Sequence, residues 1–489
     1  MGPADLIMPT SAPPPLPGDV VDQIKSLGNE VSALSDHFEA LSRAAGLSEG
    51  DAVSRLSILH GYMGVFVVAF LVTLVATPIM RRLAVAHGIV DRPSDARKMH
   101  RVPIAYLGGV GVFLGLMGGI LYSIFGTRIE GMITFHPSPA GYPVDDISGA
   151  VPISVILGIS VIMMIGLLDD VVGISPRIKV VGQLMAAAAL AYQDVGVKVA
   201  AGLLLPLAEW IGLPTTHLPG YETIGWLIPL PFAVPGLGAS IFVDFVYWTG
   251  TAVIAVFVLG GCNASNLIDG LDGLLTGVTG ICVAGLLFIA LSLALNDDGP
   301  RDAQRIVLCM ALLGACMGFL PHNFNPATIF LGDCGSLMLG FTTVVIILTL
   351  GDTGKTHLVF AGLIIYAIPI IDTSLAIVRR RLAGKAISDP DSNHMHHMLR
   401  RAMGVKRAVL SMYAFGLGFA LLGVGISLGR ARVVYVLALV FAAFIGVTAI
   451  KIARREQIEE QASASPRRAI SQPSGAAPRE RSPSEDEAA

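Results

Sequence analysis

The chain has 489 residues, of which 53% are hydrophobic and only 14% are charged. Soluble domains carry about 25% charged residues, so this composition excludes an ordinary soluble protein. The formal net charge of −3 gives no electrostatic reason to expect a nucleic-acid partner, and we predict none.

Residues 1–55 precede the first long apolar stretch and divide into two segments. Residues 1–17 are rich in Pro and are predicted to be disordered. In residues 18–55, apolar residues recur at alternating four- and three-residue steps, which predicts a short coiled coil or an amphipathic helix on the membrane surface. A coiled coil would make the chain a homodimer, and that alternative stays open. The seam consists of Val20, Ile24, Leu27, Val31, Leu34, Phe38 and Leu41.

Residues 56–452 consist mainly of long apolar stretches and are predicted to form a membrane-embedded domain. A bilayer core about 30 Å thick requires about 20 apolar residues of each spanning helix. The sequence therefore predicts an all-α polytopic membrane protein with about 11 transmembrane helices. The predicted spans are 61–80, 104–125, 149–168, 178–195, 244–262, 271–295, 304–320, 334–350, 357–378, 407–428 and 431–451.

Two further segments lie outside the predicted spans. Residues 196–243, between the fourth and fifth spans, are rich in Gly and Pro and contain strand-like stretches. They predict a small extracytoplasmic hairpin or a re-entrant element. Residues 453–489 are rich in Ser, Pro and Ala and predict a disordered cytoplasmic tail.

Lysine and arginine residues concentrate in the loops after the first and ninth predicted spans. Loops of this kind lie on the cytoplasmic side of a cell membrane. With an odd number of spans, the N-terminus is then outside and the C-terminus is in the cytoplasm. The loops after the first, third, fifth, seventh and ninth spans consequently share the cytoplasmic face.

These five cytoplasmic loops hold nearly all of the unusual polar clusters. Asp169 and Asp170 end the third span, and Asp333 begins the eighth. After the fifth span, polar residues recur at three-residue steps, a spacing that puts them along one face of a helical turn. The further candidate residues are Lys98, His100, Asn263, Asn266, Asp269, Asp272, Asn325, His394, His396 and His397.

Carboxylates gathered at one membrane edge would repel each other unless a cation lay among them. Mg²⁺ is typically bound by one or two carboxylates together with substrate phosphates, and the clustered basic residues suit those phosphates. The combination predicts Mg²⁺-assisted chemistry on a diphosphate, with Mn²⁺ as an alternative ion. Taken singly, the Asp pair and Asp333 also fit helix caps, and the histidines also fit a surface turn or an adventitious metal site.

Five sequence blocks, in order, resemble the polyprenyl-phosphate N-acetylaminosugar-1-phosphate transferase superfamily, which is glycosyltransferase family 4. The blocks are RKMHRVPIAYLGG, GLLDD, NASNLIDGLDGL, NPATIFLGDCGS and HMHH, and the resemblance spans about residues 91–399. It implies about ten or eleven helices with a cytoplasmic cleft. It also implies a Mg²⁺-dependent phosphoglycosyl transferase that moves N-acetylhexosamine-1-phosphate from a UDP-sugar to a polyprenyl phosphate such as undecaprenyl phosphate. Such a reaction releases UMP and starts the synthesis of a cell-envelope polysaccharide.

The resemblance also implies roles for individual residues. Asp169 and Asp170 match the family's catalytic acidic pair, for which proton removal from the lipid phosphate and Mg²⁺ binding are the two expected roles. Asp333 matches the metal-ligating Asp, with Asp169 as a further ligand. The other matches are Asn266, Asp269 and Asp272 for the nucleotide and the metal-diphosphate, His394, His396 and His397 for the diphosphate, and Lys98 and His100 for the basic block of the first cytoplasmic loop.

The HMHH pattern is similar to the WecA-like branch of the family and favours UDP-GlcNAc or a related UDP-HexNAc. The MraY branch, which transfers phospho-MurNAc-pentapeptide, is the alternative. Two departures leave the exact sugar open, because Tyr106 and Ser392 stand where family members often have Arg. A secondary transporter and an inactive scaffold are rivals from other classes. Transporter sites normally lie near the bilayer midplane, whereas these carboxylates lie at span ends.

Overall fold

Most of the described chain is helical. The computed structural model describes residues 49–91, 103–126, 128–129, 151–218, 221–234, 238–295, 301–382 and 394–429, with scattered positions between 436 and 451. The segments predicted to be disordered, 1–17 and 453–489, lie outside these residues, as does the whole apolar seam from Val20 to Leu41. Contacts divide the chain after Gly61, and the helices from Tyr62 onward form the unit described below.

The long helices are apolar enough to cross a bilayer. In chain order they are α2 (Glu49–Ala86), α3 (Gly108–Gly126), α4 (Ile153–Val172), α7 (Phe245–Ile268), α8 (Leu274–Leu295), α9 (Asp302–Asn323), α10 (Gly332–Gly351) and α14 (Val405–Ser427). In α2 the candidate span begins at Gly61. The described residues thus contain 8 candidate spans, or up to 10 if two bent helix pairs each count as one.

The two bent pairs correspond to the fourth and ninth predicted spans. The first joins α5 (Pro176–Tyr192) to the segment Val197–Ile211, which holds η1 (Val197–Val199) and α6 (Ala201–Ile211), with a bend of 82°. The second joins α11 (Thr356–Ile365) to α12 (Ala367–Leu382) with a bend of 75°. The chain is therefore a polytopic helical membrane protein, as predicted. Most of the eleventh predicted span lies outside the described residues, so the count of about 11 stays a prediction.

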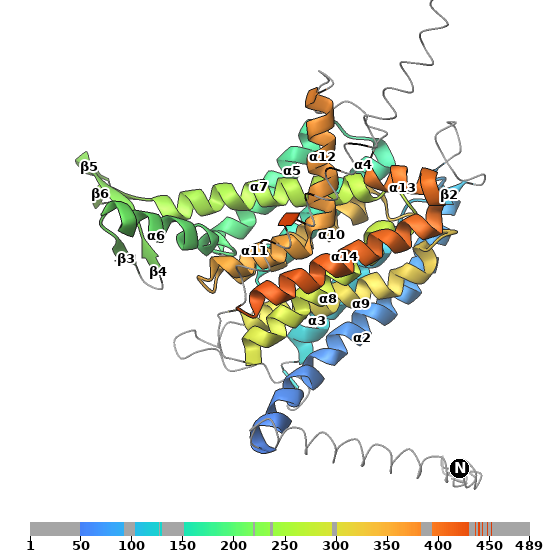
Figure 1. Cartoon of the computed structure of the whole chain (residues 1–489), viewed down its shortest axis with the longest axis horizontal. Coiled ribbons are helices and arrows are strands. Elements are labelled where there is room, and N and C mark those ends of the chain that lie inside the picture. Colours follow the sequence, from blue (N-terminus) through green and yellow to red (C-terminus); the bar gives the residue numbers. More distant parts are fainter. Residues whose placement is uncertain are drawn as a thin grey trace, which may run out of the picture. The chain divides into compact units, whose positions relative to one another are not determined.

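Helix α10 lies at the centre of the bundle (Figure 1). All of its residues from Cys334 to Gly351 are buried, and it packs against α3, α4, α7, α8, α9 and α11. The threonine hydroxyls of α10 donate hydrogen bonds to backbone carbonyls one turn earlier in the same helix. Thr342 donates to the Met338 carbonyl at 2.9 Å, and Thr343 donates to the Leu339 carbonyl at 2.8 Å. These two threonine side chains therefore need no hydrogen bond from water, which is absent around a buried membrane helix.

Glycines let neighbouring helices approach the first turn of α10 closely. A Cβ on Gly109 of α3 would collide with the backbone nitrogen of Gly335, and a Cβ on Gly166 of α4 would collide with the Cα of Cys334. Small residues at membrane helix contacts allow this close approach. The glycine contacts therefore fix α3 and α4 against the end of α10 that carries Asp333.

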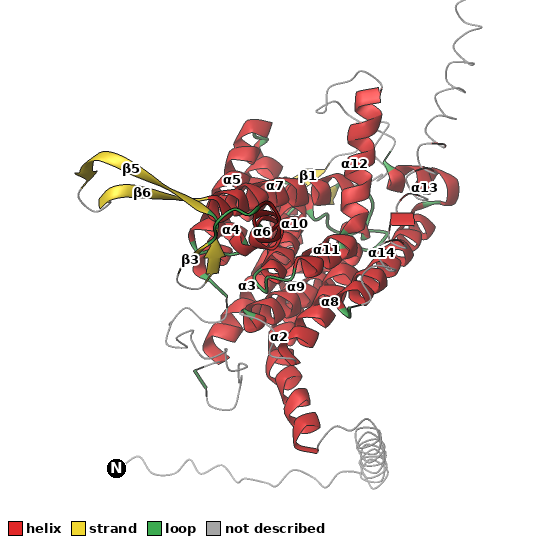
Figure 2. Ribbon diagram, turned by 60° about the vertical axis from the view of Figure 1, so that its left-hand side comes forward, coloured by secondary structure: helices red, strands yellow, loops and turns green. Residues whose placement is uncertain are grey.

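Two short hairpins occupy the connection before α7. Strands β3 (Thr216–Leu218) and β4 (Tyr221–Thr223) form the first, and β5 (Gly225–Val234) and β6 (Gly238–Asp244) form the second, both antiparallel. The β5–β6 ribbon extends away from the helices (Figure 2). Trp226, Leu227 and Ile228 of β5 are exposed. Strand-like structure was predicted here; the side of the membrane on which it lies stays a prediction.

A buried ionic cluster joins the ends of α9 and α10 that lie farthest from Asp333. Arg305 is fully buried, pairs with Asp302 and donates to the Thr349 carbonyl at 2.8 Å. Arg301 pairs with the buried carboxylate of Asp352 at 3.0 Å. At about 1.5 Å of rise per residue, Asp352 lies about 28 Å along α10 from Asp333.

Substituting Gly109 tests the close approach of α3 and α10. Gly109→Ala should destabilise the folded chain by about 1–3 kcal/mol, because the new methyl group meets backbone atoms that cannot move aside. The melting temperature in detergent measures this. Gly118→Ala in the same helix is the matched control, since its Cβ would meet only Val72 at 3.4 Å, an ordinary contact. Equal melting temperatures for the two variants would contradict the proposed tight contact.

Candidate active site

Polar residues from distant parts of the sequence meet at one end of the helical bundle. The C-terminal ends of α4, α7 and α9 lie there together with the N-terminal ends of α5, α8 and α10. The loops after the third, fifth and seventh predicted spans therefore lie at the same end of the bundle in the structure. They gather Asp169, Asp170, Asp269, Asp272 and Asp333 within a single region.

The carboxylate of Asp170 in α4 caps the first turn of α10. Its Oδ1 accepts the backbone N–H of Asp333 at 2.8 Å, and its Oδ2 accepts that of Cys334 at 3.0 Å. A negative charge is favourable at the N-terminus of a helix, where the amides have no partner in the helix itself. Gly332 has φ +73° and lies directly against Asp170, so a side chain there would be strained and would collide. Asp170 thus fixes the backbone that carries Asp333.

Lys179 of α5 bridges two of the carboxylates. Its Nζ lies 2.7 Å from Asp169 Oδ2 and 2.6 Å from Asp333 Oδ2. The second oxygen of Asp169 accepts the Ile174 amide at 3.1 Å, which holds the turn between α4 and α5. Two carboxylate oxygens therefore converge on one centre of positive charge, the arrangement that a divalent cation also requires.

The segment between α7 and α8 forms a turn that carries Asp269 and Asp272. Asp272 Oδ2 accepts the Asn325 side-chain amide at 2.8 Å and the Ala327 backbone amide at 3.0 Å. The buried Asn323 supports the same turn, because its Oδ1 accepts the Gly273 amide at 3.2 Å and its Nδ2 donates to the Ile329 carbonyl at 3.1 Å. These contacts tie the turn to the loop that leads into α10.

The four polar residues after the fifth predicted span do not lie along one helical face as expected. Helix α7 ends at Ile268, so Asp269 and Asp272 belong to the turn, and only Asn263 and Asn266 are helical. Gly273, with φ +77°, lies at the other end of this turn, directly before α8 begins at Leu274. Asn263 donates to Gln183 at 3.0 Å and to the Leu259 carbonyl at 2.8 Å. It does not line the cavity described next.

A cavity of about 710 Å³ opens beside these carboxylates. Cavities that bind small ligands have volumes of about 300–1,000 Å³, so the space suits a nucleotide-sized molecule. Acidic and amide side chains line one part of the cavity, and His397, Arg400 and Arg81 supply basic groups. The predicted residues that line it are Asn266, Asp269, Asp272, Asn325, Asp333 and His397.

Tyr106 also lines the cavity. It stands at the position where members of the resembled family often have Arg. Burial raises the pKa of Tyr106 to about 12, and the carboxylates of Asp91, Asp170, Asp333 and Asp269 add to the effect. The phenol therefore keeps its proton and can act as a hydrogen-bond donor toward the cavity.

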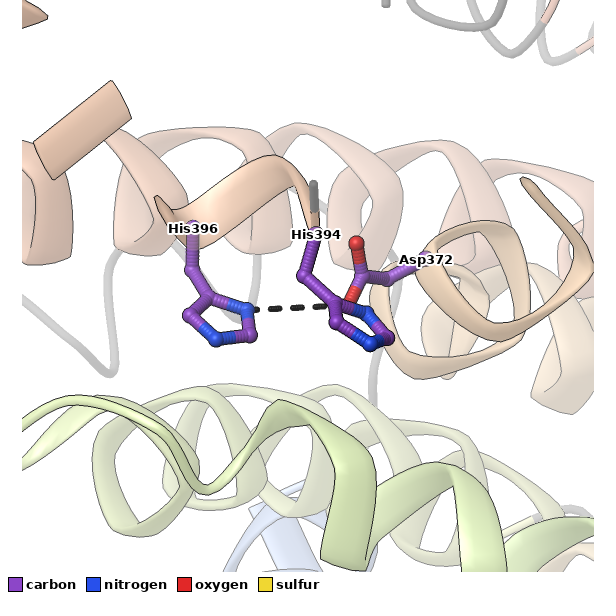
Figure 3. Close-up of side chains that lie close together, drawn as sticks. All are labelled: Asp372, His394 and His396. Carbon is purple, nitrogen blue, oxygen red and sulfur yellow. Dashed lines mark hydrogen bonds and ion pairs between the residues drawn. The ribbon is translucent and has the colours of Figure 1, made fainter. Parts of the chain in front are cut away.

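The histidines of the HMHH block lie at different depths. His394 and His396 are buried and contact Asp372 of α12, while His397 lines the cavity beside Arg400 (Figure 3 shows the buried pair with Asp372). Burial, together with the nearby His396, Arg400 and His394, lowers the pKa of His397 to about 4. His397 is thus neutral near pH 7, so it offers hydrogen bonding and no fixed positive charge to a ligand.

The structure leaves two predicted residues unplaced and adds others. Lys98 and His100 lie outside the described residues. Lys179 and Asp372 carry contacts with predicted site residues but were missed from the sequence. For Lys179, a signal existed in Ser175-Pro176, which starts α5 and returns the chain to Asp169 within one helical turn. For Asp372, a lone Asp inside an apolar stretch, the cost of burying a charge was the available signal.

The part of the chain that carries most of these carboxylates is similar to known proteins. A model of the glycosyl transferase family 4 matches residues 152–351, which include Asp169, Asp269 and Asp333. The chain is 30% identical over 359 residues to the probable undecaprenyl-phosphate N-acetylglucosaminyl 1-phosphate transferase of Bacillus subtilis, covering 73% of this chain and 82% of that protein. The chain belongs to glycosyl transferase family 4.

Other members of glycosyl transferase family 4 show similar degrees of identity. The decaprenyl-phosphate N-acetylglucosaminephosphotransferase of Mycolicibacterium smegmatis is 30% identical over 408 residues, covering 79% of this chain and 87% of that protein. The phospho-N-acetylmuramoyl-pentapeptide-transferase of Desulforudis audaxviator is 28% identical over 370 residues, covering 73% and 95% respectively. The family assignment made from the five sequence blocks is therefore confirmed.

The environment of Asp269 in this family 4 site predicts a pH-dependent stability. Burial raises the pKa of Asp269 to about 8, and the carboxylates of Asp333, Asp170 and Asp272 add to the effect. In the unfolded chain the pKa is about 4, so between pH 4 and 8 the folded state binds more protons. The free energy of unfolding consequently falls as pH rises through that window and levels off above it.

Asp269→Asn should remove this slope. Without divalent cations, we expect the free energy of unfolding of the wild-type chain to fall by about 1–2 kcal/mol more than that of the variant between pH 6 and pH 8. The difference is kept below the full value for this pKa shift because the Asp269 side chain is partly exposed to solvent. Melting temperatures in detergent with a chelator, measured at pH 6, 7 and 8, give the difference. Parallel profiles for the two proteins would show that Asp269 does not titrate in this range.

Proposed function

We propose that the chain transfers N-acetylglucosamine-1-phosphate from UDP-GlcNAc to a polyprenyl phosphate and releases UMP. The observation that carries the proposal is the convergence of Asp169 and Asp333 on one cationic centre beside a cavity lined by amides and basic groups. Two relatives at 30% identity support it, because their names specify the transfer of an N-acetylglucosamine phosphate group to undecaprenyl phosphate or decaprenyl phosphate. Undecaprenyl phosphate is the proposed acceptor, because the Bacillus subtilis relative is named for it.

The reaction is a phosphoryl transfer. An oxygen of the polyprenyl phosphate attacks the β-phosphorus of UDP-GlcNAc and forms a new P–O bond. The bond between that phosphorus and the bridging oxygen breaks, and UMP leaves with the electron pair. Such transfers need positioning of the two reactants and stabilisation of the charge on the phosphate oxygens.

Mg²⁺ is the proposed cofactor. Asp169 and Asp333 would hold it, because their Oδ2 atoms already approach the Lys179 ammonium to 2.7 and 2.6 Å. When bound, the ion would neutralise negative charge on the diphosphate. Lys179 would then shift toward one carboxylate or toward the substrate. Mn²⁺ is the alternative ion, since it accepts the same oxygen ligands.

The remaining site residues divide into two groups. Asp170 and Asp272 are engaged with backbone amides, which suits them to position Asp333 and the loop at Asn325. Tyr106, Arg400 and Arg81 line the cavity as hydrogen-bond donors, which suits them to contact phosphate oxygens. His397 adds a neutral imidazole whose pKa an anionic ligand would raise.

The MraY-type reaction is the second candidate, favoured by relatives at 27–28% identity that bear the phospho-N-acetylmuramoyl-pentapeptide-transferase name. Both candidates release UMP, so a panel of UDP-sugars separates them. A secondary transporter would instead move an ion without forming UMP.

We further propose that the acidic end of the bundle faces the cytoplasm. Cysteine-accessibility labelling beside residues 173 and 326 in sealed vesicles of known orientation tests this, since labelling of either position from the side opposite the cytoplasm would contradict it.

Asp333→Asn tests the proposed metal site. We expect the rate of UMP release from UDP-GlcNAc and undecaprenyl phosphate to fall about 100-fold or more, because an amide cannot replace a charged ligand in neutralising and holding the cation. A coupled UMP assay over a range of Mg²⁺ concentrations measures the loss.

Asp352→Asn is the matched control for that experiment, because it changes a carboxylate at the far end of the same helix. It should reduce stability through its lost pairing with Arg301 but retain the Mg²⁺ dependence of the wild-type chain. Full activity of Asp333→Asn with unchanged Mg²⁺ dependence would rule out the proposed role of Asp333.

A further inference from the structure

Asp372 of α12 is a buried carboxylate that contacts the start of α13 (Met395–Met403). It is 1% exposed, its Oδ1 accepts the Met395 backbone amide at 2.7 Å, and its Oδ2 lies 2.9 Å from His394 Nδ1. Oδ2 also lies 3.6 Å from His396 Nδ1 (Figure 3). No side chain within α13 caps the helix, since His394 occupies the N-cap position without such a bond. Asp372 therefore serves as the cap from a different helix.

The chemistry of this contact fixes the tautomer of His394. A carboxylate is only a hydrogen-bond acceptor, so the ring nitrogen that faces it must carry a proton. His394 Nδ1 is consequently the donor, and the ring plane is set by the Asp372 oxygen. A buried carboxylate and a buried imidazole that satisfy each other in this way resist rotation, because either movement leaves an unpaired polar group.

The ordered histidines connect Asp372 to the cavity. The ring of His396 lies 5.5 Å from that of His394 in a stacked arrangement and 4.2 Å from that of His397. His396 Nε2 also lies against Gly270, where a Cβ would collide with it, so the ring is wedged between α13 and the DGLDG turn. His397 and Arg400, one helical turn apart on α13, line the cavity itself.

We propose that Asp372 is a positioning residue, which holds His394, His396 and the first turn of α13 so that His397 and Arg400 face the diphosphate of the substrate. This inference rests on the proposed function, because it assigns the cavity to a nucleotide diphosphate. Asp372 itself does not line the cavity and acts only through the histidines and the helix that it caps.

Asp372→Asn is the first test, with the full-length chain in detergent. The amide keeps the size of the side chain and one acceptor but places an N–H or a weaker acceptor against His394. We expect kcat for UMP release to fall about 10- to 100-fold, by analogy with the typical loss when the outer hydrogen-bond partner of a metal-ligating histidine is removed. The KM for UDP-GlcNAc should change by less than about threefold, because the cavity residues are retained.

A double-mutant cycle separates positioning from a general loss of stability. If Asp372 acts through His397, then Asp372→Asn should add little to the effect of His397→Ala on kcat, since residues that act as a unit are not additive. Asp352→Asn is the matched control, because Asp352 is also a buried carboxylate, 6% exposed, at the other end of the bundle. Its effect on kcat should simply multiply that of His397→Ala. Multiplicative effects of Asp372→Asn and His397→Ala would overturn the proposal.

A labelling experiment tests the same proposal without turnover. Diethyl pyrocarbonate should modify the partly exposed His397 of the wild-type chain faster than the buried His394 and His396, as read by mass spectrometry of the peptide. In Asp372→Ala all three should react at similar rates, whereas an unchanged pattern would overturn the proposal. If the wild-type chain released no UMP from any UDP-sugar, the proposed function would fail while this labelling result still decided the role of Asp372.

A metal ion is the competing occupant of the cluster, since ligand atoms of Asp372, His394 and His396 lie within 4.8 Å of one another. Elemental analysis of the purified chain distinguishes the two. One equivalent of a transition metal that is lost in His394→Ala would overturn the hydrogen-bonded arrangement, and its absence from the wild-type chain would support it.

Discussion

The site depends on the contact between the Asp170 carboxylate and the first amides of α10. Helix α10 is buried from Cys334 to Gly351, and the amides of its first turn have no acceptor within the helix itself. The two hydrogen bonds from Asp333 and Cys334 satisfy that end of the helix and join it to α4. Asp169, the next residue along α4, is thereby brought to the same ammonium group as Asp333. The two members of the acidic pair thus have different roles. Asp170 orders the backbone of α10, and Asp169 binds the Lys179 ammonium group.

Acidic and basic side chains both line the cavity. The carboxylates of Asp269, Asp272 and Asp333 come from the turn between α7 and α8 and from α10, whereas Arg400 and His397 come from α13. A metal-bound diphosphate requires the same division, because its cation needs oxygen ligands while its oxygens need donors. The low dielectric of the surrounding helices strengthens both kinds of contact. The membrane boundary further allows a water-soluble nucleotide and a lipid phosphate to reach one place.

Much of the architecture could be predicted from the sequence, and the reasons are physical. Apolar stretches of bilayer length specify helices, and alternation of the chain across the membrane specifies which loops meet. That argument placed Asp169, Asp170, Asp269, Asp272 and Asp333 at one end of the bundle. It failed at finer scale, where the spacing of Asn263 and Asp272 matched a helical face although α7 ends at Ile268, between them. It also missed Lys179 and Asp372, because a single charged residue inside an apolar stretch reveals its partner only when neighbouring helices are in place.

The complete enclosure of α10 has a consequence for how the chain is made. This helix is synthesised after α3, α4, α7, α8 and α9, which together cover most of its surface. Its mean hydropathy of 2.0 lets it enter the bilayer unaided, yet its glycine contacts and its acidic first turn suit it only to a protein environment. We therefore expect α10 to take its final place between helices that are already inserted. The end of the bundle that carries Asp333 would then be completed late in assembly.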